Sequence, residues 1–368
     1  MNRLFGVILR AMKEYLKFKA GPGILNMIME EGLKRERVRV FAGPAGGPKW
    51  FVSVGLDKAF IKMGYLKRVD GGKTLLAGSS AGAWRCLTMA CKEPLEAYER
   101  LRIAYSRNIF TALDTPSSIS AKLRANVNSF ISDEDIESIT DSRYFNLAIH
   151  VVRSKGLAAS SSQRREGLAL LAAASMNVVS PRLMRLFYER VVFYSGEPEP
   201  AFLDDSFYGS KRRLDAGNVR WAALATGSLP YIISGVSELG HTDSDVYRDG
   251  GLLDYQLNQD YRPGSDGLTL FFHYQERIAP GWFDKRLTWR KPEPEALERV
   301  LQIYPGQDFV DLLPDKRIPD RTDFTVFVDN PAERIRRWDE VSRLSGILAD
   351  YFFETVESGK IRNLVQPL

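Results

Sequence analysis

The chain has 368 residues, of which 44% are hydrophobic and 26% charged, a composition typical of a globular protein with a sizeable core. Lysine and arginine outnumber aspartate and glutamate by 51 to 46, and the charges are interleaved, which argues against a dedicated nucleic-acid-binding protein. No apolar run reaches the roughly 18 residues that a membrane-spanning helix needs.

The first segment has the pattern of an amphipathic helix. Apolar side chains from Phe5 to Leu16 recur at helical spacing, and basic residues such as Arg10 lie on the opposite face. Such a helix either packs on the domain or lies on a membrane surface. We therefore expect an N-terminal helical extension over residues 1–36, with a second helix after the Gly-Pro-Gly break at residues 21–23.

The next part of the chain alternates between β-rich and helical patterns. Residues 38–42 are β-rich and end in a glycine- and proline-rich loop at residues 43–48. A helical pattern over residues 50–63 and a short apolar strand at residues 74–77 follow. This order predicts an α/β fold with a mostly parallel central sheet, whose ligands collect at the carboxyl ends of the strands.

Residues 37–275 are expected to form one catalytic core, in which residues 94–140 are mostly helical. Further core strands are expected at residues 145–152, 191–194 and 269–274. A helical insertion is expected at about residues 156–188, and residues 276–368 are expected to form a C-terminal mixed extension. In that extension, Asn330 can cap a helix whose buried stripe runs to Leu348.

Cysteine and histidine are scarce. Cys86 and Cys91 stand five apart in a segment with a helical pattern, so they face different directions and form no disulfide framework. The histidines, His150, His241 and His273, are far apart and form no ligand pair, so we expect no metal and no organic cofactor. The low cysteine content and the lack of a signal-peptide pattern favour a cytoplasmic protein.

A serine nucleophile is indicated by the sequence Gly-Ser-Ser-Ala-Gly, which spans Gly78 to Gly82. The motif lies between an expected strand and an expected helix, the context in which G-x-S-x-G forms a nucleophile elbow. The glycines permit a tight turn that holds Ser80 clear of the sheet at a helix N-terminus, which favours developing negative charge. Taken alone, five matching residues are more often an ordinary glycine turn, and the expected strand and helix on either side make a nucleophile elbow about as frequent an outcome.

Donors for an oxyanion are expected nearby, because acyl transfer through a serine needs them. Gly46 and Gly47 follow the preceding strand, and the N–H of Ala81 follows the nucleophile. Lys49 places a positive charge beside this loop, where it can steady the loop or favour anionic substrates. The alternative is a phosphate-binding glycine loop. The sequence contains neither G-x-x-x-x-G-K-[ST] nor a complete G-x-G-x-x-G, the usual patterns of such loops.

Asp249 is the candidate base. It precedes Gly250 and Gly251, and a carboxylate can accept the proton of serine when burial raises its proton affinity. Asp-Gly-Gly is by itself more often a turn. The alternative is a triad of Ser80, Asp249 and His273, in which histidine is the base, although His273 stands inside an apolar run.

Together these motifs resemble the patatin-like phospholipases, over about residues 37–255. The matching elements are residues 45–49, 78–82, 225–230 and 249–251, in the family's order. The resemblance implies a three-layer α/β/α core and a catalytic dyad of Ser80 and Asp249. The chain departs from the family where Ala45 replaces the first loop glycine, where Lys49 stands in place of the common arginine, and where Trp50 replaces the closing glycine.

We therefore expect a serine lipid acyl hydrolase that acts through an acyl-enzyme. Its expected partner is an acyl lipid, with a phospholipid favoured by the resemblance, and contact with a membrane surface is consistent with the first segment. The alternatives are an α/β-hydrolase esterase with the triad and an inactive lipid-binding protein on the same fold.

Overall fold

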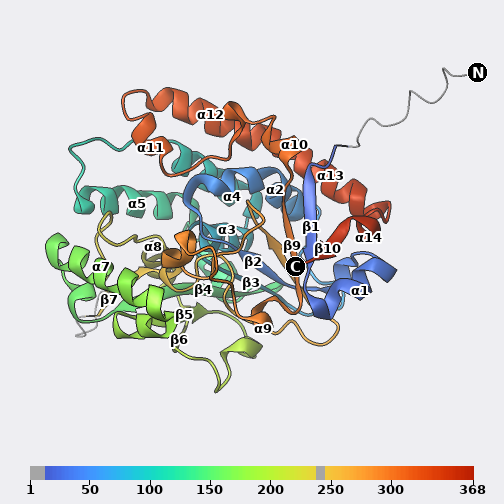
Figure 1. Cartoon of the computed structure of the whole chain (residues 1–368), viewed down its shortest axis with the longest axis horizontal. Coiled ribbons are helices and arrows are strands. Elements are labelled where there is room, and N and C mark those ends of the chain that lie inside the picture. Colours follow the sequence, from blue (N-terminus) through green and yellow to red (C-terminus); the bar gives the residue numbers. More distant parts are fainter. Residues whose placement is uncertain (1–12, 238–244) are drawn as a thin grey trace, which may run out of the picture.

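The computed structural model describes residues 13–237 and 245–368 as one α/β fold (Figure 1). Its centre is a mostly parallel sheet of ten strands in the order β10-β1-β9-β8-β2-β3-β4-β5-β6, with β7 paired to β4. The strands are β1 (Leu16–Ala20), β2 (Val38–Gly43), β3 (Thr74–Ser79), β4 (Phe145–Ser154), β5 (Tyr188–Tyr194), β6 (Ser210–Arg213), β7 (Val246–Asp249), β8 (Leu268–Phe272), β9 (Val300–Pro305) and β10 (Val365–Pro367). The predicted fold class is confirmed.

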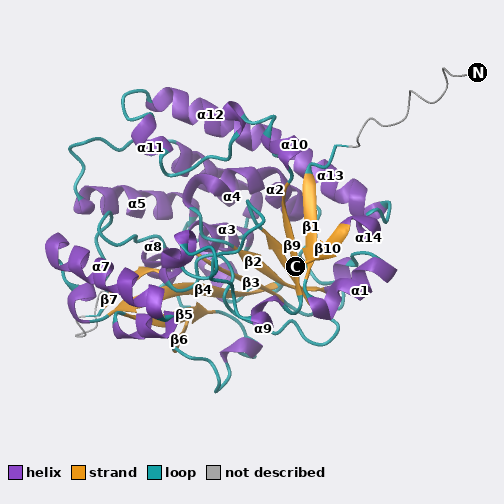
Figure 2. Cartoon of the chain, in the orientation of Figure 1, coloured by secondary structure: helices purple, strands orange, loops and turns teal. Residues whose placement is uncertain are grey.

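Helices lie around this sheet (Figure 2). They are α1 (Pro22–Glu31), α2 (Val54–Lys62), α3 (Ala81–Met89), α4 (Pro94–Ser106), α5 (Pro116–Phe130), α6 (Asp135–Thr140), α7 (Gln163–Val179), α8 (Val219–Thr226), α9 (Pro294–Leu297), α10 (Gln307–Val310), α11 (Asp323–Val326), α12 (Pro331–Leu344), α13 (Gly346–Glu357) and α14 (Ile361–Leu364). Among the described helices, none combines the length and the apolar character needed to cross a lipid bilayer.

The core lies on both faces of the sheet. On one face, a large cluster joins Phe41 and Leu76 of the strands to residues of α2, α3, α4, α8 and α13. On the other face, Val40 and Ala77 pack under Phe202 and neighbouring loop residues. Burial on both faces explains why β3 reads as a continuous apolar run instead of an alternating one.

Strand β4 has two different neighbours along one of its edges. Its first half pairs in parallel with β3, where Ser79 lies opposite His150. Its second half pairs antiparallel with β7, where Asp249 lies opposite Val151. Strand β5 occupies the other edge of β4. The ends of β3 and β7 therefore meet at consecutive positions of β4, and this brings Ser80 next to Asp249.

The N-terminal segment differs from the predicted helical extension. Residues 1–12 lie outside the described part of the chain, and Leu16–Ala20 forms strand β1 between β9 and β10. Leu16, Phe18 and Ala20 are buried and alternate with partly exposed lysines, which is the two-residue period of a strand. The helical prediction for these residues was therefore wrong. Strands β9 and β10 extend the same sheet from the C-terminal segment.

Other boundaries also shift. The helical insertion ends before Tyr188, which already belongs to β5, and the helix predicted from residue 50 begins as a 3-10 turn over Gly47–Ser53. The predicted cap is present, since the Asn330 side chain accepts from the Glu333 N–H at 3.2 Å. Helix α12 ends at Leu344 because the chain turns at Ser345, whose hydroxyl accepts the Gly55 N–H at 2.7 Å.

A buried ion pair joins the helices behind the elbow. Arg85 of α3 donates to both carboxylate oxygens of Asp57 on α2, at 2.6 and 2.8 Å, and the Tyr98 hydroxyl of α4 donates to the same carboxylate. The three side chains are buried. This contact fixes the direction in which α3 leaves the elbow.

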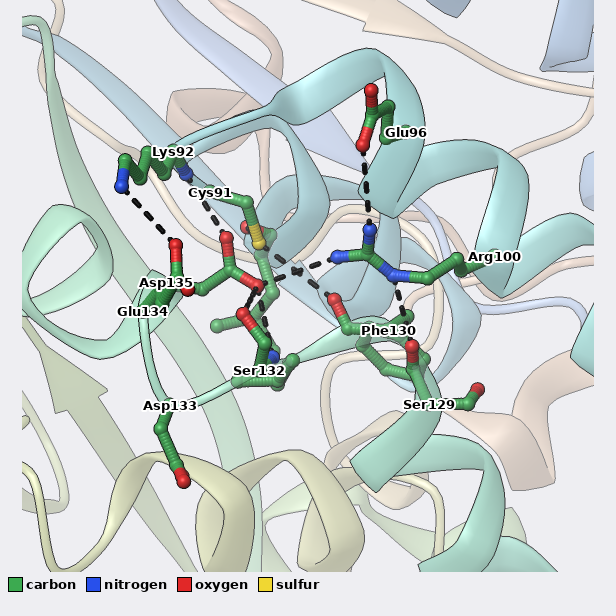
Figure 3. A network of polar contacts seen from close by, with 12 residues as sticks. Cys91, Lys92, Glu96, Arg100, Ser129, Phe130, Ser132, Asp133, Glu134 and Asp135 are labelled. Carbon is green, nitrogen blue, oxygen red and sulfur yellow. Dashed lines mark hydrogen bonds and ion pairs between the residues drawn. The ribbon is translucent and has the colours of Figure 1, made fainter.

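A second network holds α4, α5 and α6 together (Figure 3). The buried Asp135 carboxylate accepts from the N–H and hydroxyl of Ser132, at 2.8 and 2.6 Å, and from the Lys92 N–H at 3.1 Å. Arg100 of α4 lies 3.4 Å from the same carboxylate. Asp135 thus connects the segment before α4, helix α4 itself and the turn after α5.

Arg85→Met should destabilise the protein, because among the described residues it leaves the buried Asp57 with Tyr98 as its one side-chain donor. Removal of one partner from a buried pair costs about 3–5 kcal/mol, so we expect a loss of roughly 3 kcal/mol in the free energy of unfolding. Urea denaturation followed by circular dichroism measures it. The control is Lys92→Met, whose exposed pair with Glu134 should contribute less than about 1 kcal/mol. Equal losses in both variants would contradict the central role of the Asp57–Arg85 pair.

Candidate active site

Ser80 lies on a strained turn between β3 and α3. Its backbone angles are φ 52° and ψ −131°, a conformation that residues with side chains rarely adopt. A side-chain carbon on Gly82 would lie 2.0 Å from the Gly43 carbonyl oxygen, and one on Gly78 would lie 2.7 Å from the same atom. Only glycine fits at these positions, so the turn has the geometry predicted for a nucleophile elbow.

The Ser80 hydroxyl donates a hydrogen bond to Asp249 Oδ2 at 2.8 Å. The other carboxylate oxygen accepts the Gly251 N–H at 2.8 Å. A side-chain carbon on Gly250 would lie 2.1 Å from the His150 carbonyl oxygen, so this turn also requires glycine. The structure thus brings together the predicted nucleophile and the predicted base, with both side chains buried.

Burial raises the pKa of Asp249 above the ordinary aspartate value, because the charged form loses its hydration. The positive charge of Arg321 and the hydrogen bonds from Gly251 and Ser80 act in the opposite direction and limit the rise. A carboxylate with a raised pKa is a better proton acceptor than an exposed one.

Thr226 supports the elbow from behind. Its hydroxyl accepts the Ser80 N–H at 2.8 Å and donates to the His150 carbonyl at 2.7 Å. The neighbouring Ser79 points elsewhere, since its hydroxyl donates to the Asp254 carbonyl at 2.6 Å. The two adjacent serines therefore have different surroundings, and only Ser80 contacts Asp249.

The predicted oxyanion loop lies next to the elbow. Ala45 is held by hydrogen bonds to Tyr255 and Tyr274, and a side-chain carbon on Gly46 would lie 2.5 Å from the Tyr274 ring. Gly47 has a positive φ of 58°. Ala81 is the first residue of α3, where the backbone N–H has no partner within the helix. The donor roles of Gly46, Gly47 and Ala81 stay predictions.

The two departures at the end of this loop, Lys49 and Trp50, contact other segments of the protein. Lys49 lies 3.5 Å from Asp320 and 4.9 Å from the centre of the Tyr274 ring, so it connects the loop to the C-terminal segment. Trp50 is buried and packs on Phe51 and the tyrosines of α4. Lys49 therefore joins the loop to the C-terminal segment, while Trp50 belongs to the core, and the supporting role of Lys49 stays a prediction.

The described histidines do not contact the dyad. His273 Nδ1 lies 2.5 Å from the Gln275 carbonyl, and burial lowers its pKa to about 3. His150 contacts Asp254 and Tyr261, and His241 lies outside the described residues. Within the described residues, no cluster of three or more histidine, cysteine, aspartate or glutamate side chains is arranged to hold a metal ion.

An apolar cavity of about 550 Å³ contains Ser80 in its wall. Its volume is within the range of roughly 300–1,000 Å³ that is usual for small-molecule sites. The apolar part of its lining includes Trp84, Ile119, Leu123, Leu229, Ile233 and Phe324. Ser80 is thus placed where an apolar ligand can reach it. No protein-family model and no curated protein matches the chain.

Three parts of this site were not predicted as functional from the sequence. Arg321 and Phe324 line the cavity from the C-terminal segment, and Tyr105 lines it from α4. No local motif surrounds them. Phe324 is held by α12, whose buried Arg334 lies 4.6 Å from the centre of its ring and donates to the Ser106 carbonyl of α4 at 3.0 Å. The C-terminal segment therefore completes the cavity.

Asp249→Asn should stabilise the protein at neutral pH. Because the folded-state pKa of Asp249 is raised, the free-energy penalty for its ionisation is absent below pH 3.8, grows as pH rises, and is complete above the raised pKa. Asparagine does not ionise, so the melting temperature of the Asp249→Asn protein should exceed that of the wild type at pH 7. The difference between the two melting temperatures should shrink toward pH 4. Scanning calorimetry at both pH values measures this. A less stable variant at pH 7 would contradict the penalty.

Proposed function

We propose that the chain is a serine ester hydrolase that cleaves acyl lipids with a Ser80–Asp249 dyad. The observation that carries the proposal is the 2.8 Å hydrogen bond from the hydroxyl of Ser80, on a strained turn beside an apolar cavity, to the buried Asp249 carboxylate. A nucleophile bonded directly to a base of raised pKa is the arrangement that covalent acyl transfer requires.

In the first step, Ser80 Oγ attacks the carbonyl carbon of the ester and its proton passes to Asp249 Oδ2. The carbonyl oxygen becomes negatively charged, and the N–H of Ala81, the N-terminus of α3 and the Gly46–Gly47 loop stabilise it. The bond to the leaving alcohol then breaks, and Asp249 returns the proton to that oxygen. An acyl group remains on Ser80.

In the second step, water attacks the acyl-enzyme. Asp249 accepts a proton from the water molecule, the bond between the acyl carbon and Ser80 Oγ breaks, and the proton moves to Ser80 Oγ. The carboxylic acid leaves and the dyad is restored. The proposed reaction uses no metal or organic cofactor.

The cavity supports an acyl lipid as the substrate class, because its lining is mostly apolar. Two of its apolar residues, Ile232 and Val328, are 50% and 39% exposed, so the apolar surface continues to the outside of the protein. This favours a substrate delivered from a lipid surface. The resemblance to patatin-like phospholipases favours a phospholipid.

Ser80→Ala should abolish labelling by a fluorophosphonate probe and hydrolysis of a short-chain aryl ester, with a fall of at least about 1,000-fold. In-gel fluorescence measures the labelling by the probe, and absorbance measures the hydrolysis of the aryl ester. The matched control is Ser79→Ala, which should retain most of both because its hydroxyl bonds to the Asp254 carbonyl. Labelling that moves to Ser79 would reassign the nucleophile, and no labelling of the wild type would favour a lipid-binding protein without activity.

Asp249→Asn and His273→Gln separate the dyad from the triad. The asparagine keeps the shape of the base but not its basicity, so hydrolysis should fall by about 100- to 10,000-fold. His273 lies outside the contact between Ser80 and Asp249, so His273→Gln should stay active within about threefold, a change far smaller than the roughly 100- to 10,000-fold loss expected when a general base is removed. Circular dichroism checks folding. A folded but inactive His273→Gln protein would rule out the dyad.

A further inference from the structure

Arg321 places a cation in the wall of the cavity that contains Ser80. It precedes α11, which lies on the same side of the sheet as α5 (Figure 1). Its Nε lies 2.7 Å from the point that a side-chain carbon on Gly47 would occupy. The side chain therefore fills the space that Gly47 leaves open, directly beside the predicted oxyanion loop.

The Arg321 guanidinium has no neutralising partner within residues 13–237 and 245–368. The adjacent Asp320 lies 3.5 Å from Lys49. Asp249 is close enough for the charge of Arg321 to lower its pKa, but its oxygens accept from Ser80 and Gly251. An arginine that is partly buried beside a cavity and lacks a carboxylate partner is unusual, because such cations are normally paired.

Two further cations lie near Arg321. Burial lowers the pKa of Lys285, and the nearby charges of Arg321 and Lys49 act in the same direction. The three cations outnumber Asp249 and Asp320, and Asp249 is already bonded to Ser80. Arg321 therefore brings a positive charge into a cavity wall whose other residues are mostly apolar, and Lys49 and Lys285 add positive charge close to Arg321 but outside that wall.

We propose that Arg321 binds an anionic group of the substrate, a phosphate or a carboxylate, while the acyl chain occupies the apolar part of the cavity. The planar guanidinium can form two parallel hydrogen bonds to either anion. The proposal depends on the proposed function in one respect, which is that the ester lies at Ser80, between the anionic group at Arg321 and the acyl chain. It assigns selectivity for charged esters to the C-terminal segment, which lies outside the resemblance.

Binding tests the site without any reaction. The protein is the full chain with Ser80→Ala, and calorimetry measures the dissociation constants of octyl phosphate, nonanoate and octanol. Adding Arg321→Gln should raise the Kd of at least one of the two anions, octyl phosphate or nonanoate, by about tenfold or more, since charge-assisted hydrogen bonds are stronger than neutral ones. The Kd of octanol should change by less than about twofold. Whichever of octyl phosphate and nonanoate loses more affinity identifies the anion.

Arg336→Gln is the matched control, because it removes an exposed arginine from α12 and should leave all three constants unchanged. Arg321→Lys keeps the charge without the planar group, so its Kd should lie between those of the arginine and glutamine proteins. Unchanged anion binding in Arg321→Gln, or equal losses for the anions and octanol, would overturn the proposal. Because Ser80 is absent from these proteins, failure of the hydrolase proposal appears only in the fluorophosphonate experiment.

Discussion

The contact between the start of α3 and the ends of β2 and β3 determines the shape of the whole site. Gly43, Gly78 and Gly82 approach so closely that a single additional carbon would collide with backbone atoms. The chain can enter α3 only through a backbone conformation that is unfavourable for Ser80. The Thr226 hydroxyl on one side, and Arg85 within α3 itself, hold that conformation in place.

Burial of Asp249 connects reactivity to stability. Asp249 is removed from water and accepts two hydrogen bonds from the described residues. These surroundings make it a better proton acceptor than an exposed aspartate, but they also disfavour its charge. The positive charge of Arg321 lowers the pKa of Asp249 and so limits the cost of ionising it. No hydrogen bond joins the two side chains, so this stabilisation is partial. In the proposed reaction, one cation would thus adjust the base and select the substrate.

The elbow and the Asp-Gly-Gly turn could be located from the sequence because their glycines mark positions where the backbone turns tightly or approaches another segment closely. The parallel sheet could be predicted for a similar reason, since alternating strand and helix patterns constrain topology. Arg321 could not be assigned a role in this way, because its position depends on how α11 and α12 pack against α4. Strand β1 was missed because Leu16 and its neighbours fit a helical period when their partners in β9 are unknown.

The position of β1 also sets an order of assembly during synthesis. Strand β1 precedes all the other described strands along the chain but lies between β9 and β10, which follow it by about 280 residues or more. Until those strands leave the ribosome, the backbone N–H and C=O groups of β1 have no partners in the sheet, so it presents an open edge to other nascent chains. Its lysines, Lys17 and Lys19, place charge along that edge, a common protection against premature pairing.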